Sequence, residues 1–372
     1  MLTKEKLFEL KIEPPDSDIL EAAGRKWDGI SKPIDGLGDF EKVVARIAAI
    51  EGELLPSIDK RAAVIFCADN GIVEEGISQT GSEITEAVAK ALGAGISTAC
   101  TLGRSAGVDV IPADIGIDCN EAIEGVMDLK VRKGTRNFLK EPAMTEGEAL
   151  IAIERGMELA SDLHKKGYSV LATGEMGIGN TTTSAAVLSA LLHIDSDEIV
   201  GRGSGLDDEG LNRKRDVVRQ GLLKYGFAES VEKAESQRRD AVNCGDKLKT
   251  FDVLCALGGL DIAGLAGLCI GCAISHIPVV LDGLISTTAA LVAEGLVSGV
   301  KDYLIPSHEG REKGNVLALE ALGLTPLIKG NMALGEGTGA IMLFPTLDVV
   351  MDYYLGGAKF DDYSIDEYKR FD

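Results

Sequence analysis

Short runs of β-branched and apolar residues alternate along this chain with longer stretches of helical periodicity. Most of the runs end in glycine or an acidic residue. Strands separated by helices form a mostly parallel sheet covered by helices, and such sheets bind ligands at the carboxyl ends of their strands. We therefore predict an α/β fold. The predicted strands are 63–69, 109–114, 169–173, 278–282 and 303–307, and the predicted helices include 84–102, 145–166, 181–192 and 210–225.

Both ends of the chain depart from this alternation. Two helices are predicted near the N-terminus, at 17–27 and 40–53, and a turn-rich joint separates them. Residues 230–249 are polar and charged, so we expect a solvent-facing connector there. Together with the C-terminal tail, the first helices suggest a small helical domain. The predicted division is 1–58 and 346–372 for this small domain and 59–345 for the large α/β domain.

The charge and the cysteines restrict the class of protein. A net charge of -21 disfavours nucleic acid and anionic membranes, which bind clustered Lys and Arg. It does not exclude a phosphate ligand, because helix N-termini bind phosphate inside acidic proteins. The seven scattered cysteines are an odd number and predict no disulfide framework. The charged N-terminus, Met1 to Lys6, lacks an apolar signal core, so we expect a cytoplasmic protein.

One uncharged stretch, 262–281, has about the length of a membrane span. His276 and Pro278 interrupt it, so we interpret it as a buried helix followed by a parallel strand. Cys269 and Cys272 within it have the spacing of a metal or redox pair. They stand alone, without a second pair or a histidine cluster, and are expected to be small apolar residues of the helix. No metal site is predicted.

Two glutamates framed by glycines lie far apart in the sequence. Glu175 belongs to the segment 174–182, and Glu336 belongs to the segment 334–340. Glycine on both sides of a carboxylate lets a ligand approach the backbone closely, which packing alone seldom requires. The pair predicts a binding or catalytic site. Glu336 is a candidate general base whose pKa burial would raise.

Two glycine-rich segments are suited to phosphate. In 173–182 a strand end passes through glycines into a helix with a predicted threonine cap, whose N–H groups and dipole favour an anion. The loop 201–208 precedes Lys214, whose ammonium group could neutralise a phosphate, although a solvated loop before an amphipathic helix is equally compatible. The chain has no GxxxxGK[ST] or GxGxxG motif and no acidic pair typical of a magnesium–pyrophosphate site. The remaining interpretation is a monophosphate substrate that binds without a metal or cofactor.

Six blocks, in order and covering about residues 15 to 355, resemble the nicotinate-nucleotide:dimethylbenzimidazole phosphoribosyltransferase family, which makes the lower-ligand nucleotide of cobalamin. The blocks are 67–72 with 75–78, 114–116 with 133–135, 174–182, 201–208, 258–263 with 281–286, and 307–308 with 334–337.

The resemblance implies a reaction. The phosphoribosyl group of nicotinate mononucleotide passes to a nitrogen of 5,6-dimethylbenzimidazole, which releases nicotinate and gives α-ribazole 5′-phosphate with inversion at C1′. Glu336 matches the family's general base, and Glu175 matches a second carboxylate near the reacting groups. The pyridinium of the donor is already a cationic leaving group, so the family needs no divalent ion.

The resemblance also implies the binding residues and the assembly. The candidates for the phosphate and ribose are Gly177, Asn180, Gly203, Lys214 and Ser286, and those for the azole pocket are Thr80, Val88 and Leu334. The family fold is a Rossmann-like parallel sheet with a small helical domain built from both termini. It forms a homodimer with active sites near the interface.

Three residues depart from the family pattern. Asn70 stands where many members have histidine, Ala333 replaces a common arginine, and Val88 offers no polar group to the base. Dimethylbenzimidazole, other benzimidazoles, adenine and phenols therefore all stay open as acceptors, and relatives that use phenols work as paired non-identical subunits. A non-catalytic nucleotide- or azole-binding protein is the alternative from another class. A dehydrogenase is disfavoured by the missing dinucleotide motif.

Overall fold

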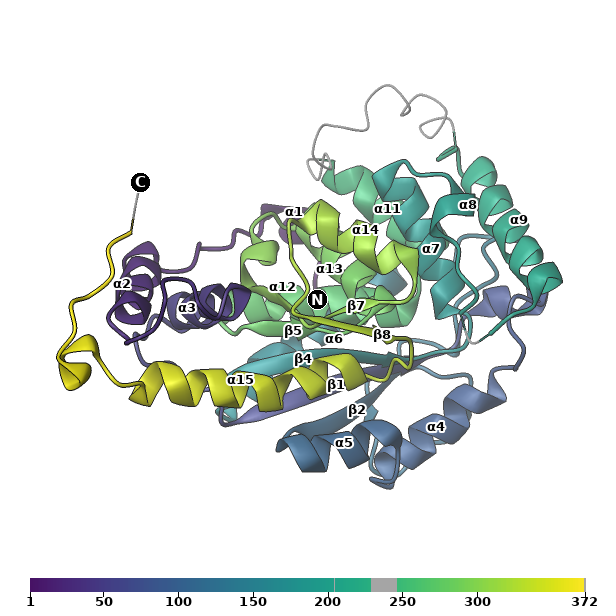
Figure 1. Cartoon of the computed structure of the whole chain (residues 1–372). Coiled ribbons are helices and arrows are strands. Elements are labelled where there is room, and N and C mark those ends of the chain that lie inside the picture. The colour runs from purple at the N-terminus through teal and green to yellow at the C-terminus, as the bar shows by residue number, and fades with distance from the viewer. Residues whose placement is uncertain (204, 229–245, 371–372) are drawn as a thin grey trace.

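The computed structural model describes residues 1–203, 205–228 and 246–370, and its centre is a six-stranded sheet (Figure 1). The order is β3-β2-β1-β4-β5-β6, and every neighbouring pair is parallel. The α/β prediction is confirmed, as are the five predicted strands to within a few residues. The strands are β1 (Arg61–Ala68), β2 (Asp109–Gly116), β3 (Met127–Asp128), β4 (Val170–Met176), β5 (Val279–Leu281) and β6 (Leu304–Pro306).

Alternate residues of β1 enter two separate hydrophobic cores, because successive side chains of a strand point to opposite faces of the sheet. Val64 and Phe66 pack on one face, and Ala63 and Ile65 pack on the other. The first face is covered by α6 (Glu146–Lys165), α7 (Asn180–Leu192), α9 (Asp208–Lys224), α11 (Lys247–Leu257), α12 (Leu260–Ile274), α13 (Leu284–Leu296) and α14 (Lys313–Leu322). The second is covered by α2 (Ser17–Asp28), α3 (Asp39–Glu51), α4 (Glu83–Gly93), α5 (Thr98–Ala106) and α15 (Thr338–Gly356).

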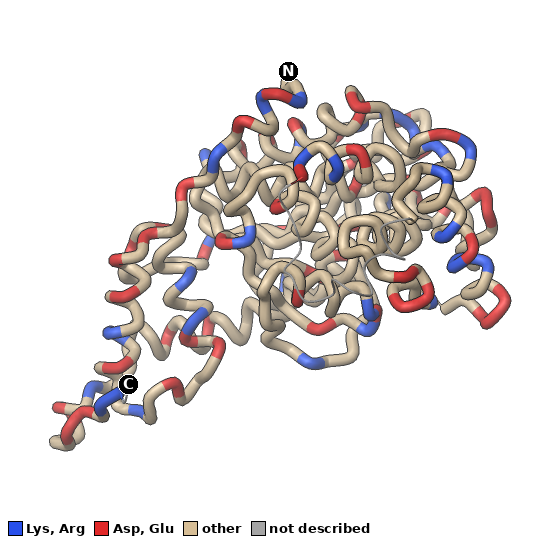
Figure 2. Tube along the Cα trace, turned by 90° about the horizontal axis from the view of Figure 1, so that it is seen from above, with Lys and Arg blue, Asp and Glu red and all other residues tan. Residues whose placement is uncertain are grey.

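The uncharged stretch 262–281 forms most of α12 followed by β5, as predicted. Residues 260–273 of α12 are all buried, and Cys269 and Cys272 are among them. Figure 2 shows the charged residues over the outer parts of the molecule and few of them among the central helices. Within the described ranges, no helix combines the length and the apolar character that crossing a bilayer requires.

The predicted helix 84–102 is wrong, because two helices occupy this segment. Gly95, with φ of 72°, ends the first in a conformation that glycine adopts easily. The Ser97 side chain then accepts a hydrogen bond from the Cys100 N–H and begins α5. The break places the N-terminus of α5 beside the loop that precedes α15.

α2 and α3 lie beside α15 and the C-terminal segment at one end of the molecule (Figure 1). The Trp27 ring of α2 lies 4.8 Å from the Tyr354 ring of α15, and Ile30 forms a β-bridge with Lys359. α15 continues through position 345 without a break. The division into 1–58, 59–345 and 346–372 stays a prediction. Of the predicted connector 230–249, residues 230–245 lie outside the described residues, and α11 begins at Lys247.

Five short elements were not foreseen. They include a separate two-stranded parallel sheet of β7 (His308–Gly310) and β8 (Ile328–Met332). The others are α1 (Lys4–Glu9), α8 (Ser196–Ile199) and β3, which has two residues. Such segments carry too few residues for a hydrophobic period to appear in the sequence.

The backbones of α6 and α12 approach closely. A Cβ on Gly267 would overlap the Ile153 carbonyl, whereas a Cβ on Gly147 of α6 would have no atom within 4 Å. We predict that Gly267→Ala lowers the free energy of unfolding by about 1–3 kcal/mol through overpacking. Gly147→Ala, the matched control, should be neutral or stabilise by up to about 1 kcal/mol. Urea unfolding of both variants checks this, and equal effects would contradict the close packing.

Candidate active site

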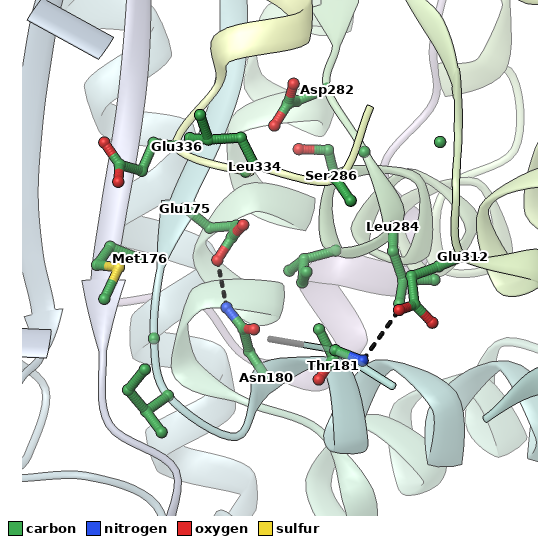
Figure 3. A pocket seen from close by; sticks show the side chains of 18 of the residues that line it. Glu175, Met176, Asn180, Thr181, Asp282, Leu284, Ser286, Glu312, Leu334 and Glu336 are labelled. Atoms are coloured by element: carbon green, nitrogen blue, oxygen red, sulfur yellow. Dashed lines mark hydrogen bonds between the residues drawn. The ribbon is translucent and has the colours of Figure 1, made fainter. Parts of the chain in front are cut away.

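A cavity of about 340 Å³ lies where the order of the strands reverses, at the carboxyl end of β4. This reversal is the usual ligand position in open α/β sheets, because the connections from neighbouring strands there lead to opposite faces. The walls come from the end of β4, the start of α7 and the loops that precede α13, α14 and α15. Figure 3 shows ten of the lining residues by name.

The two glycine-framed glutamate motifs pack directly against each other. A Cβ on Gly174 would lie 2.9 Å from the Gly337 nitrogen, and a Cβ on Gly335 would lie 2.9 Å from Glu175 Oε1. The contact at Gly174 is with backbone and leaves no room for a side chain, and Gly335 has φ of 86°, a conformation that glycine adopts easily. Two segments about 160 residues apart thus bring Glu175 and Glu336 into the lining of one cavity.

Glu175 is buried and shares a hydrogen-bond donor with a second carboxylate. Asn180 Nδ2 donates to Glu175 Oε2 (Figure 3) and also to Asp261 Oδ2 at 3.2 Å. Burial and then the charge of Asp261 raise the pKa of Glu175 to about 8. Burial likewise raises the pKa of Asp261 to about 6. The inner end of the cavity therefore favours neutral carboxyl groups or a bound cation.

Glu336 is held in a left-handed backbone conformation, with φ of 56°. A residue with a side chain adopts this region at a cost and usually where the surroundings impose it. Its carboxyl group is partly buried, and Oε2 has no hydrogen-bond partner in the described part of the chain. Burial raises the pKa of Glu336, and the Ala99 N–H at the start of α5 opposes that rise. Such a carboxyl group is suited to accepting a proton.

Asp282, at the end of β5, fixes the loop that carries Glu336. Asp282 Oδ2 accepts the Gly337 N–H at 3.1 Å, and Oδ1 accepts those of Gly339 at 2.8 Å and Ala340 at 3.2 Å. These are N–H groups at the start of α15, which have no partner within the helix. A distant carboxylate therefore caps α15.

The other end of the cavity holds a buried cation. Lys214 Nζ donates to Thr181 Oγ1 at 2.8 Å; burial lowers the pKa of Lys214 to about 8, and Glu312 opposes that change. The Gly203 N–H donates to Glu312 Oε1 at 3.0 Å. Ser286 at the start of α13 also lines the cavity, and its Oγ is buried without a hydrogen-bond partner among the described residues. This end can therefore receive an anionic oxygen.

The start of α7 differs from the sequence-based expectation. Gly179, with φ of 93°, is the N-cap, and no side chain caps the helix, so the predicted threonine cap is wrong. Thr181 lies in the first turn instead. Gly177 lines the cavity beside Asn180, and a Cβ there would overlap the Ala68 carbonyl.

The candidate azole residues are divided between the lining and the surface. Val88 and Leu334 line the cavity, and Leu334 is 56% exposed. Thr80 is exposed and is not among the lining residues, whereas Ser78 from the same segment is. Of the departures from the family pattern, Val88 and Ala333 line the cavity. Asn70 is buried and donates to the Ile178 carbonyl at 3.3 Å.

Several lining or supporting residues were not singled out from the sequence. Asp282 ends a predicted strand and Asp261 comes two residues after the pair Gly258-Gly259, so both carried the strand-end or glycine signal that pointed to Glu175. Arg202 lies in the glycine-rich loop 201–208 and His308 in the block 307–308, but neither was named as a site residue, and Glu312 carried no local signal. In the described part of the chain, no group of three or more His, Cys, Asp or Glu side chains has an arrangement that could hold a metal ion.

We predict an unusual pH dependence of stability from Glu175. The folded state binds this proton more tightly than the unfolded chain, so the contribution to stability is complete below about pH 4.5 and is lost as the pH rises through about 8. Relative to the wild type, Glu175→Gln should therefore unfold with a flatter pH dependence between about pH 6 and about pH 8. Urea unfolding at several pH values measures this. The exposed Glu320→Gln serves as control, and parallel curves for wild type and Glu175→Gln would contradict the assignment.

The phosphoribosyltransferase family model DBI_PRT matches residues 12–365. A nicotinate-nucleotide–dimethylbenzimidazole phosphoribosyltransferase from Acetivibrio thermocellus is 40% identical over 99% of this chain and 98% of its own length. One from Geobacter metallireducens is 41% identical over 89% of each chain. The crystal structure of CobT from Thermus thermophilus is similar with a TM-score of 0.83 and 34% identity, covering 94% of this chain and all of that one. The chain belongs to this phosphoribosyltransferase family.

Proposed function

We propose that this protein transfers the phosphoribosyl group of nicotinate mononucleotide to a nitrogen of 5,6-dimethylbenzimidazole or a related azole. The products are nicotinate and α-ribazole 5′-phosphate, the nucleotide of the cobalamin lower ligand. The observation that carries the proposal is the polarity of one cavity, with paired carboxyl groups at one end and a buried lysine at the other. Relatives named for this reaction match nearly the whole chain.

The lysine end is suited to the 5′-phosphate. Lys214, the Gly203 N–H and the Ser286 hydroxyl are hydrogen-bond donors in the lining of the cavity. The Gly203 N–H is already hydrogen-bonded to the Glu312 carboxylate, so its orientation suits an anionic oxygen. Lys214 keeps its proton more firmly once a phosphate lies beside it, because an opposite charge favours the charged form.

The carboxyl end is suited to the reacting groups. In our proposal one azole nitrogen attacks C1′ from the face opposite nicotinate, while Glu336 accepts the proton of the other nitrogen. The bond from C1′ to the pyridinium nitrogen breaks, and its electron pair stays on nicotinate. The configuration at C1′ inverts. The leaving group begins as a cation, so its departure neutralises charge and needs no divalent ion.

The acceptor ring would lie against Val88 and Leu334. Both are apolar side chains on the cavity wall, and the exposed Leu334 would bury apolar surface on binding a flat ring. One methyl group changes discrimination in an apolar pocket by only about 1–3 kcal/mol, so several azoles should be accepted. Thr80 would reach the ring only if the 78–84 segment moved inward.

We also propose a cytoplasmic homodimer. Met342 and Val349 lie seven residues apart on α15, so they share one helix face, and they are 48% and 69% exposed. Burial of such residues between subunits would remove apolar surface from water. Light scattering should give twice the chain mass of 39.2 kDa.

The first test is product formation by the purified protein from nicotinate mononucleotide and 5,6-dimethylbenzimidazole without added metal. We expect α-ribazole phosphate by chromatography and mass. Glu336→Gln should lower kcat by about 10²–10⁴-fold, the usual contribution of general base catalysis. The exposed Glu320→Gln is the control. Failure of the wild type with a panel of azoles and phenols would instead favour a non-catalytic binding protein or a missing partner subunit.

The second test separates the two ends of the cavity. Lys214→Met removes the buried ammonium and should raise KM for nicotinate mononucleotide by about 10- to 100-fold, as expected for a lost hydrogen bond to a charged group. KM for the azole should change little. Lys313→Met, at an exposed lysine outside the cavity lining, should leave both constants near those of the wild type. An equal change in both KM values would argue against a phosphate role.

A further inference from the structure

Glu175 and Asp261 share the amide group of Asn180. Its nitrogen donates one hydrogen to Glu175 Oε2 and the other to Asp261 Oδ2. All three side chains are buried, and Asp261 has no exposed surface. The Asn180 amide is rigid and planar, and both of its N–H hydrogens are used. The two hydrogen bonds therefore fix how the carboxyl groups of Glu175 and Asp261 lie relative to each other.

No positive charge balances this pair. The groups that face it from the other elements are Asp69 after β1, Asp282 after β5, Glu336 before α15 and the Cys67 thiol of β1, whose pKa is raised by burial. In the ranges that the structure describes, no Lys, Arg or His forms an ion pair or hydrogen bond with Glu175 or Asp261. Two like charges in one buried site cannot both persist, so one carboxyl group keeps a proton.

The hydrogen bonds indicate which group keeps it. Among the described residues, Asp261 accepts the N–H groups of Asn180 at 3.2 Å and Ile262 at 2.9 Å, whereas Glu175 accepts that of Asn180 alone. N–H donors stabilise the charged form of a carboxyl group. Asp261 is therefore the better-stabilised anion. The pKa values agree in order, since burial raises that of Glu175 to about 8 and that of Asp261 only to about 6.

We propose that Asp261 is a positioning residue of the active site, which through the shared Asn180 amide holds Glu175 in place and keeps it protonated at neutral pH. The role in the reaction rests on the function proposed above. A protonated Glu175 is a hydrogen-bond donor and cannot accept the azole proton. Its Oε1 faces Gly335, at the start of the loop that carries Glu336. The two glutamates then have different tasks, with Glu336 as the base and Glu175 as a neutral donor to the substrates.

The pH dependence of kcat/KM distinguishes this role from a purely structural one. The wild type should lose activity on the alkaline side with an apparent pKa near 8, when Glu175 loses its proton. Asp261→Asn should move this limb to lower pH by about one unit or more, a tenfold change in the acid constant, because it removes the neighbouring negative charge. An unchanged limb in Asp261→Asn would overturn the proposal.

Glu175→Gln should remove the alkaline limb of the pH profile, whereas Asp261→Asn should move it. Glutamine is a neutral isostere of protonated glutamate and keeps a donor, so this variant should retain at least about a tenth of the wild-type kcat/KM at neutral pH and should lose the alkaline limb. Glu336→Gln should be far less active. If Glu175→Gln were as inactive as Glu336→Gln, the protonated state would not be the working one, and the proposal would fail.

Infrared spectroscopy tests the protonation without any enzymatic activity. The difference spectrum between wild type and Glu175→Gln at neutral pH should contain a protonated carboxyl C=O band that disappears as the pH rises through about 8. Asp261→Asn should lose the band at lower pH. Absence of the band in the wild type overturns the proposal even if Asp261→Asn does not fold. Its presence in a protein that forms no product would reject only the proposed reaction.

Discussion

The geometry of the cavity depends on one buried carboxylate, that of Asp282. Its two oxygens accept three backbone N–H groups at the start of α15. Charge-assisted hydrogen bonds of this kind are strong, and they satisfy donors that a helix leaves unpaired. Because Asp282 follows β5 and the donors follow Glu336, the interaction joins the carboxyl end of β5 to the loop that bears the proposed base. The left-handed conformation of Glu336 and the contact between Gly174 and Gly337 both rely on this joint.

The charges in the cavity form a gradient rather than a uniform acidic surface. Asp261 and Glu336, with Glu175 neutral in our proposal, lie near the end of β4, and Lys214 lies near the start of α7. Nicotinate mononucleotide carries a cationic pyridinium-bearing ribose and an anionic phosphate, so this gradient would orient it in one direction. Burial strengthens the effect because the local dielectric is low. A chain with a net charge of -21 can thus bind a phosphate through local groups.

The sequence predicted the sheet and the paired glutamate motifs because both have local signals. β-Branched runs predict strands, and glycines beside a carboxylate indicate a close approach whatever the partner is. The helix predicted over 84–102 failed at Gly95, where apolar periodicity continued through a backbone conformation that ends the helix. Asp282 and Glu312 were missed as site residues because their hydrogen-bond partners lie far away in the chain. Thr80 and the domain boundaries came from resemblance or composition, which carry no distances.

The protonation of the site could not be inferred from the sequence, because it depends on charges that only the fold brings together. A lone Glu175 buried beside Asn180 would have a pKa set by burial and one hydrogen bond, but Asp261, Asp282 and Glu336 each add a charge that raises it. The proton affinity of Glu175 therefore depends on the charge of these neighbours. A motif can identify the acids of such a site, but only their arrangement in space divides them into donor and base. The shared Asn180 amide is the part of that arrangement that makes Glu175 and Asp261 unequal.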